Sequence, residues 1–175
     1  MANRRDRNAL LRYEKERRKN LLATPGDHAF VLILDQLKPG FNVPKIFRSA
    51  EAFGTTAVHL IDVGPFDPAP AKGSFRKVPA VFHEDFATCH RQLQEAGYRF
   101  FQLAPECGES LCTITFPEKS AFILGHEEFG CSFDRKDYPD ITSLHIPQFG
   151  SVQSLNVSIA SSVVMYEYVR QHAKG

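Results

Sequence analysis

Five side chains in three short segments have the types that bind a ligand or act on one. They are Asn42, Arg48, Glu127, Ser154 and Asn156, and each segment also contains glycine or proline. Amides, hydroxyls and carboxylates orient a substrate through hydrogen bonds, and a guanidinium binds a phosphate or a developing oxyanion. The predicted chemistry is therefore the positioning of a polar substrate and the handling of its proton.

The first segment, Asn42 to Ala50, places its two polar residues on a predicted helix. Asn42 and Arg48 are six residues apart, which is roughly 600° around a helix, so their side chains lie on different faces. They converge only if Asn42 is the N-cap and its side chain turns back over the loop. The same spacing fits a helix cap followed by a surface arginine, and the pattern alone leaves both interpretations open.

The second segment, residues 124–130 (LGHEEFG), is a predicted turn after a strand. Its glycines allow the backbone to approach a ligand closely. Its His-Glu-Glu string lacks the H-E-x-x-H spacing of a helical zinc site. Glu127 is a candidate acid, and the alternative is a carboxylate that accepts hydrogen bonds from N–H groups of its own loop.

The third segment, residues 146–158, is predicted to pass from a strand through a Gly-Ser loop into a helix. N–H groups at the start of that helix suit a carboxylate or phosphate. Asn156 and Ser158 interrupt an apolar run, where an unpaired polar group is costly. Each is therefore expected to have a specific partner.

Strands and helices alternate along the body of the chain. Short apolar runs predict strands at 29–34, 57–61, 98–103, 121–124 and 144–146, and periodic patterns predict helices at 42–53, 86–95 and 155–172. Pro44 in a first helical turn and Gly54 after a last one fit these boundaries. In the final helix, a packed apolar stripe is expected at Leu155, Ile159, Val163 and Tyr166.

This alternation with short joints predicts the α/β class, with a mostly parallel sheet covered by helices on both faces. In open sheets of this kind the ligand binds at the carboxyl ends of the strands. The second and third polar segments follow strand ends directly, so they are expected to lie close together.

The N-terminal region differs in charge from the rest. Residues 1–19 hold eight basic and three acidic residues, a net +5, which leaves −4 on the remainder of a chain whose total is +1. A helix is predicted from about residue 5 to 22, with its apolar stripe at Leu10, Leu11, Tyr13, Leu21 and Leu22, and Thr24-Pro25-Gly26-Asp27 ends it. We expect a basic helical extension (1–24) and a body (25–175). A polyanion partner and a merely solvated helix both fit the charge.

Composition excludes several classes of protein. No apolar run approaches the ~20 residues that span a bilayer, and the charged N-terminus does not resemble a secretory signal, so a cytoplasmic protein is expected. The cysteines Cys89, Cys107, Cys112 and Cys131 form no C-x-x-C pair and have no neighbouring histidine at zinc spacing. Free thiols and no metal site are expected.

Taken in order, the three segments resemble a known family. The patterns N-x-x-x-x-x-R-x-A, L-G-x-E-x-x-G and I-P-x-x-G-x-x-x-S-L-N-V-S are similar to motifs 1, 2 and 3 of the SpoU/TrmH branch of the SPOUT methyltransferases. The resemblance covers roughly residues 30–172. The first two patterns are common alone, whereas the S-L-N-V-S helix start is specific.

The resemblance implies a fold and a reaction. Its members have a deep trefoil knot in the C-terminal segment, form homodimers with the final and motif 1 helices near the interface, and transfer a methyl group from S-adenosylmethionine to a ribose 2′-hydroxyl of RNA. By position, the residues implied to line the cofactor pocket are Leu103, Gly125, Ile146, Ser154 and Leu155. The residues implied to be catalytic are Arg48, Asn42, Glu127, Ser154 and Asn156.

For Arg48 we expect a fork that holds the ribose and its phosphate and stabilises the alkoxide, because a guanidinium is a poor base. The expected RNA-binding residues are basic: Arg4, Arg5, Arg12, Arg17, Arg18, Lys19, Arg76 and Lys77. We expect tRNA as the substrate. The alternatives are the same reaction on ribosomal RNA and a catalytically silent dimer that binds RNA.

Two positions depart from the family pattern. Pro44 stands where glycine is usual, so the first motif has a stiffer backbone without that N–H. His126 stands where asparagine is usual. Neither change removes a candidate catalytic residue, so activity is expected, and the property that these two changes bear on is the placement of the substrate.

Overall fold

The computed structural model describes residues 4–104 and 108–173, with the side chains of Arg4 and Arg5 outside the described set. Its centre is a seven-stranded sheet in the order β3-β2-β1-β6-β4-β7-β5. The strands are β1 (His28–Asp35), β2 (Thr55–Ile61), β3 (Ala80–His83), β4 (Arg99–Leu103), β5 (Glu109–Ser110), β6 (Ser120–Gly125) and β7 (Ile141–His145). Every pairing between these named strands is parallel.

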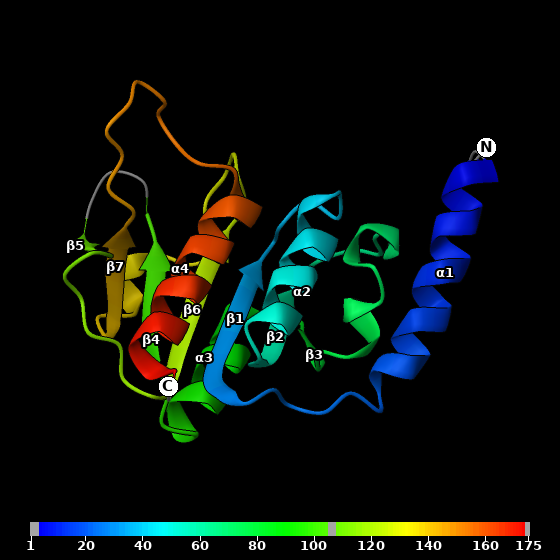
Figure 1. The fold of residues 1–175 in the computed structure, drawn as a ribbon, viewed down its shortest axis with the longest axis horizontal. Coiled ribbons are helices and arrows are strands. Elements are labelled where there is room, and N and C mark those ends of the chain that lie inside the picture. The colour runs from blue at the N-terminus through cyan, green and yellow to red at the C-terminus, as the bar shows by residue number, and fades with distance from the viewer. Residues whose placement is uncertain (1–3, 105–107, 174–175) are drawn as a thin grey trace.

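Helices cover both faces of this sheet, as expected. The α-helices are α1 (Arg4–Asn20), α2 (Asn42–Ala52), α3 (Phe86–Glu95) and α4 (Val157–His172), with short 3-10 turns at Ala69–Ala71, Ser74–Arg76 and Arg135–Asp137. In Figure 1, α2 and α4 lie side by side in front of the sheet, α3 lies behind it, and α1 stands at one end of the molecule.

The alternation of side chains on β1 divides the core into two layers. Phe30, Leu32 and Leu34 pack into the larger cluster, under α2 and α4. Val31 and Ile33 point the opposite way, into the smaller cluster under α3. A strand with apolar residues on both sides belongs in the middle of a parallel sheet covered on both faces, which is where β1 lies.

Most predicted elements are confirmed. The helix predicted at 86–95 has those bounds, and Gly54 follows α2 with a φ of +64°. The final helix begins at Val157, two residues later than predicted, because Asn156 is its N-cap. The short edge strands β3 and β5 were not predicted. β5 consists of two polar residues, and the apolar run of β3 is only residues 80–82, shorter than the roughly four to eight residues that mark a buried strand.

Two predicted apolar stripes are confirmed only in part, at Tyr13 in the first, which is buried, and at Val163 in the second, which packs against the core. Of the five apolar residues predicted for the stripe near the N-terminus, only Tyr13 is buried, and the side chains of Leu10, Leu11, Leu21 and Leu22 are exposed. In α4, Ile159 is 54% and Tyr166 is 59% exposed, while Val164, Met165 and Tyr168 face the core. The helical period was predicted correctly, but α4 has apolar residues on two faces. The face that carries Tyr168 packs on the sheet, and the face that carries Ile159 and Tyr166 is exposed.

Two buried residues of α1, Tyr13 and Asn20, pack against the body. The Tyr13 ring stacks on Phe75, with centroids 5.7 Å apart, and meets the edge of Phe66 at 5.2 Å. Buried Asn20 donates to the carbonyl oxygens of Phe75 and Val78 and accepts from the N–H of Ala80. The helix is therefore held in place at its middle and at its C-terminus.

Across residues 4–104 and 108–173, none of the helices has the length and apolar character required to cross a membrane.

Candidate functional site

A cavity of about 510 Å³ opens where β4, β6 and β7 end and α4 begins. All five residues expected to hold the cofactor line it, and so do three of the five candidate catalytic residues. These lining residues are Leu103, Gly125, Ile146, Leu155, Ser154, Glu127 and Asn156. The position agrees with the rule that ligands of parallel sheets bind at the carboxyl ends of the strands.

The loop after β6 is closed tightly against the cavity. The N–H of His126 donates to the carbonyl of Gly130 over 2.7 Å, and the N–H of Gly130 donates back over 2.9 Å. A Cβ on Gly125 would lie 2.6 Å from the carbonyl carbon of Gly130, which no real side chain tolerates. Glycine at 125 is therefore required for the loop to fold back over its own strand.

Asp35 anchors the far end of the same loop. Its buried carboxylate accepts from the N–H of Ser132 over 2.7 Å and from the Ser132 hydroxyl over 3.1 Å. Burial raises the pKa of Asp35 despite these bonds. Burial and the nearby Asp35 charge also raise the pKa of the Cys131 thiol to about 12. Cys131 lines the cavity, and a protonated thiol there is an apolar wall rather than a nucleophile.

His126 closes the loop in the way that an asparagine would. Its Nδ1 accepts from the N–H groups of Glu128 at 3.0 Å and Phe129 at 3.3 Å. A side-chain oxygen of asparagine makes this type of local bond to backbone N–H groups. The neutral ring then carries its proton on Nε2. The departure at 126 thus preserves the fold of the turn.

A chain of hydrogen bonds joins the three polar segments. The amide of Asn156 donates to Oδ1 of Asn42 over 3.2 Å, and the amide of Asn42 donates to Oε1 of Glu127 over 2.7 Å. Asn156 also caps α4, because its Oδ1 accepts from the N–H of Ser158 at 3.0 Å and from its hydroxyl at 2.6 Å. The partners expected for Asn156 and Ser158 are therefore each other.

Asn42 and Arg48 occupy places that differ from the sequence-based expectation. Asn42 is the first residue of α2 rather than its N-cap; Phe41 is the cap, without a side-chain bond. The side chain of Asn42 is turned instead toward Glu127. Arg48 is exposed, does not line the cavity, and has no hydrogen bond or ion pair with another described residue. Within one chain, Asn42 and Arg48 do not converge.

Sequence reasoning missed two polar residues of the cavity, Gln102 and Gln148. Gln102 donates to the sulfur of Cys131 over 3.2 Å. The Oε1 atom of Gln148 is buried and has no hydrogen-bond partner among the described residues. Both follow or end strands, and that position was the only sequence signal that could have identified them.

Some of the predicted RNA-binding residues already contact other side chains of the protein, and others are exposed without such a contact among the described residues. Arg12 forms a two-bond ion pair with Asp67, Lys77 pairs with Glu51, and Lys19 pairs with Glu16. Arg17 lies over the ring of Phe82 at 4.2 Å. Arg18 and Arg76 are exposed, and no ion pair is seen for them within the described parts of the chain. The side chains of Arg4 and Arg5 lie outside the described set.

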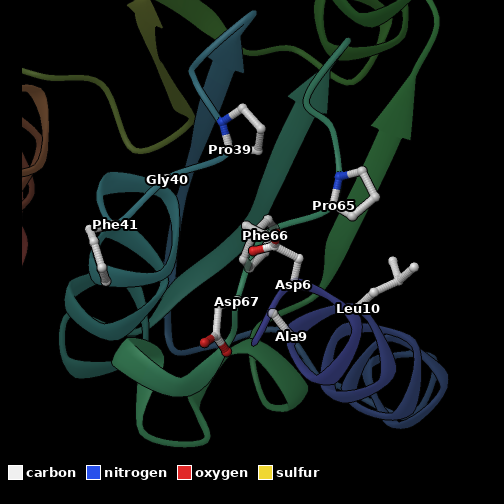
Figure 2. A pocket seen from close by; sticks show the side chains of 9 residues that line it. All are labelled: Asp6, Ala9, Leu10, Pro39, Gly40, Phe41, Pro65, Phe66 and Asp67. Carbon is white, nitrogen blue, oxygen red and sulfur yellow. The ribbon is translucent and has the colours of Figure 1, made fainter. Parts of the chain in front are cut away.

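A second cavity, of about 400 Å³, lies between α1 and the loops that follow β1 and β2. Figure 2 shows the residues that line it, with Asp6, Ala9 and Leu10 on α1 and Phe66 and Asp67 on the loop after β2. Phe41, at the start of the first motif, also lines it and is 73% exposed. None of the residues expected to bind the cofactor lines this cavity.

Comparisons with known proteins identify relatives in sequence and in structure. A 23S rRNA (guanosine-2'-O-)-methyltransferase RlmB from Xylella fastidiosa (strain 9a5c) is 30% identical over 164 residues, which is 91% of this chain and 66% of that protein. The chain therefore spans about two thirds of the length of this curated relative.

Solved structures share the fold. An AdoMet-bound rRNA methyltransferase from Sinorhizobium meliloti has a TM-score of 0.75 at 21% identity, covering 90% of this chain and 61% of that one. A structure described as giving insights into the 2-OH methylation of C/U34 on tRNA has a TM-score of 0.73 at 29% identity, covering 84% of this chain and 98% of that one.

The model of the SpoU rRNA Methylase family matches residues 29–166, which include all three polar segments. The chain belongs to the SpoU rRNA Methylase family.

Proposed function

We propose that this protein transfers a methyl group from S-adenosylmethionine to a ribose 2′-hydroxyl of RNA. The observation that carries the proposal is the cavity at the strand ends, whose residues from the second and third motifs are tied to Asn42 of the first by two hydrogen bonds. The family model and the names of the curated relatives support the same reaction.

The cavity fits the proposed cofactor in size and chemistry. Its volume of about 510 Å³ lies in the usual range for small-molecule sites. The close approach at Gly125 leaves backbone rather than a side chain against the ligand. The buried Oε1 of Gln148 supplies an acceptor for an amino group. Leu103, Ile146 and Leu155 would hold the cofactor through apolar contacts.

Catalysis is proposed to consist of placing the 2′-oxygen in line with the methyl group and passing its proton to the Glu127 carboxylate at the cavity. The cofactor, when bound, supplies a methyl group activated by the adjacent sulfonium. The Asn156–Asn42–Glu127 chain holds two amides and a carboxylate at the mouth of the cavity. Arg48 binds the ribose and its phosphate and stabilises the oxygen as it loses its proton.

The proposal includes a homodimer, because Arg48 does not line the cavity of its own chain and a dimer gives it a place at the interface. The α4 face with Ile159 and Tyr166 is exposed, and Phe53 beside α2 meets the edge of Tyr166 at 6.3 Å. α2 contacts α4 directly, with Ser49 and Ser162 hydrogen-bonded over 2.8 Å. A dimer that buries this face brings Arg48 to the interface. A trefoil knot in the C-terminal segment is also part of the proposal, and the match to the family model over residues 29–166 supports it.

For the RNA, we propose tRNA, with ribosomal RNA as the second candidate. The 29% identical structure concerned with C/U34 of tRNA supports the first, and the RlmB names support the second. Residues 1–24 are proposed as an RNA-contacting extension, through exposed basic residues such as Arg18.

The deciding experiment is methyl transfer with labelled cofactor to bulk tRNA and bulk rRNA from cells that lack this protein, followed by mapping of the modified ribose. We expect one ribose 2′-O-methyl group in one RNA class. Calorimetry with Leu155→Arg tests the cofactor cavity separately. Unchanged cofactor affinity in that variant contradicts the cavity assignment, and cofactor binding without transfer to either RNA supports the silent RNA-binding dimer.

A further inference from the structure

A cluster of nitrogen and sulfur donors lies on the opposite side of the sheet from α2 and α4. His59 on β2, His83 on β3 and Cys89 on α3 each offer one donor atom, and these three atoms lie within 4.8 Å of one another. Nδ1 of His59 is 2.8 Å from Nε2 of His83, with the rings stacked at 5.1 Å. Three elements that are separate in sequence therefore bring metal-ligating atoms to one point.

The donor set suits one class of ion. Two imidazole nitrogens and a thiolate are the ligands that Zn²⁺ and similar divalent transition metals prefer, whereas Mg²⁺ and Ca²⁺ require oxygen. Tetrahedral binding at about 2.0–2.1 Å separates two nitrogens by about 3.3 Å. The two rings therefore need to move apart by only about half an ångström.

The three residues of the cluster differ in solvent exposure, so an ion would be enclosed on one side and reachable from solvent on the other. Cys89 is fully buried and His59 is 7% exposed, whereas His83 is only half-buried. Three protein ligands with an approach from the half-buried side leave a fourth position for water, as in open zinc sites.

The position also gives such an ion a consequence for the fold. β3 is the edge strand next to β2, and it is short, with all four side chains only half-buried. A metal bound to β2, β3 and α3 links this edge strand to its neighbour and to the helix above them. The cluster shares no residue with the cavity at the ends of β4, β6 and β7.

We propose that His59, His83 and Cys89 form a binding site for one divalent transition-metal ion of the zinc type, which fastens the β3 edge of the sheet. The thiol of Cys89 loses its proton to solvent when the ion binds. The site is independent of the proposed methyl transfer.

The test is a titration of the chelator-treated full chain with Co²⁺, followed by competition with Zn²⁺ and by thermal unfolding. We expect one equivalent to bind, with an absorption band from cobalt–thiolate charge transfer, displacement by Zn²⁺, and a higher Tm that EDTA reverses. His83→Ala should weaken binding at least tenfold, and Cys89→Ser should remove the charge-transfer band.

Matched controls are Cys112→Ser, an exposed free thiol, and His145→Ala, a histidine on β7; both should bind like the unaltered chain. His83→Ala is the decisive variant, because His83 is half-buried on the edge strand β3 and its replacement leaves the apolar core intact. Equal Co²⁺ affinity in His83→Ala and the unaltered chain overturns the site. Absence of the thiolate band in the unaltered chain also overturns it, leaving a hydrogen-bonded histidine pair beside a packed thiol.

Discussion

Asn42 illustrates what single side chains contribute to this molecule. It donates to Glu127 and accepts from Asn156, so one amide orients an acid 85 residues away and an asparagine 114 residues away. Both contacts lie on the exposed side of the cavity, where a substrate can replace or join them. The three motifs are therefore coupled through residue 42 rather than through the apolar core.

Arg48→Ala is expected to lower the rate of methyl transfer by about 10²–10³-fold, the usual cost of losing one donor to a developing oxyanion. Cofactor affinity should remain within a few-fold, because Arg48 does not line the cavity. Single-turnover transfer assays and calorimetry measure the two quantities. A parallel loss of both would make Arg48 structural, and Lys45→Ala, exposed on the same helix, is the control.

His126→Asn is expected to retain methyl transfer, because the amide oxygen can accept from the N–H groups of Glu128 and Phe129 in place of Nδ1. His126→Ala should weaken cofactor binding about fivefold, the equivalent of about 1 kcal/mol for a lost local hydrogen bond. Calorimetric titration of both variants tests this. If the asparagine variant were as weak as the alanine one, the imidazole would have a contact of its own in the cavity.

At the scale of elements, Asn20 holds the C-terminus of α1 to the segment before β3. Asn20→Ala leaves two carbonyl oxygens and one N–H without their partner. The free energy of unfolding should fall by about 1–3 kcal/mol, the cost of unsatisfied buried polar groups. Urea denaturation measures it. Asn8→Ala, exposed on the same helix, should change stability by under about 0.5 kcal/mol.

Arg18 is the better probe of RNA contact by α1, since Arg12 is already paired with Asp67. Arg18→Ala should reduce the slope of log affinity against log salt by about one, as expected for one lost phosphate contact. Filter binding across a salt series gives the slope. Lys136→Ala, exposed on the turn Arg135–Asp137, is the matched control, and an unchanged slope in Arg18→Ala would leave α1 as a structural helix.

Helices and strands were predictable where the sequence has one clear pattern, such as a continuous apolar run or a helical period. The apolar run of β1 and the capped helix at 86–95 appear at their expected positions. The five residues that the motif resemblance assigns to the cofactor line one cavity, and their role there stays a prediction. The docking of α1 was not predictable, because its buried contacts come from one aromatic residue and one asparagine that stand among charged residues. The cluster of His59, His83 and Cys89 was also missed, since its residues have no zinc spacing in the sequence.

At the scale of the whole molecule, the exposed face of α4 is the feature that one chain leaves unexplained. Tyr166→Asp should convert the proposed dimer to a monomer and abolish methyl transfer, because a charge on a buried apolar interface is costly. Light scattering after size exclusion gives the mass, and the same samples give activity. An active monomer would place the whole reaction within one chain. Glu167→Gln, the next residue along the helix, serves as a control for stability, because it retains an acceptor for Arg170.

The order of the strands also determines when, during translation, each edge of β1 can form its hydrogen bonds. β1 lies between β2 and β6, so one of its two edges stays bare until residues 120–125 have been made. The end of β1 at Asp35 and the start of β6 at Ser120 are 85 residues apart. At about 5–20 residues per second, translation of these residues takes roughly 4–17 seconds. During that interval the nascent chain displays a continuous apolar strand with open hydrogen-bonding groups. Ribosome-associated chaperones would meet this protein chiefly through β1.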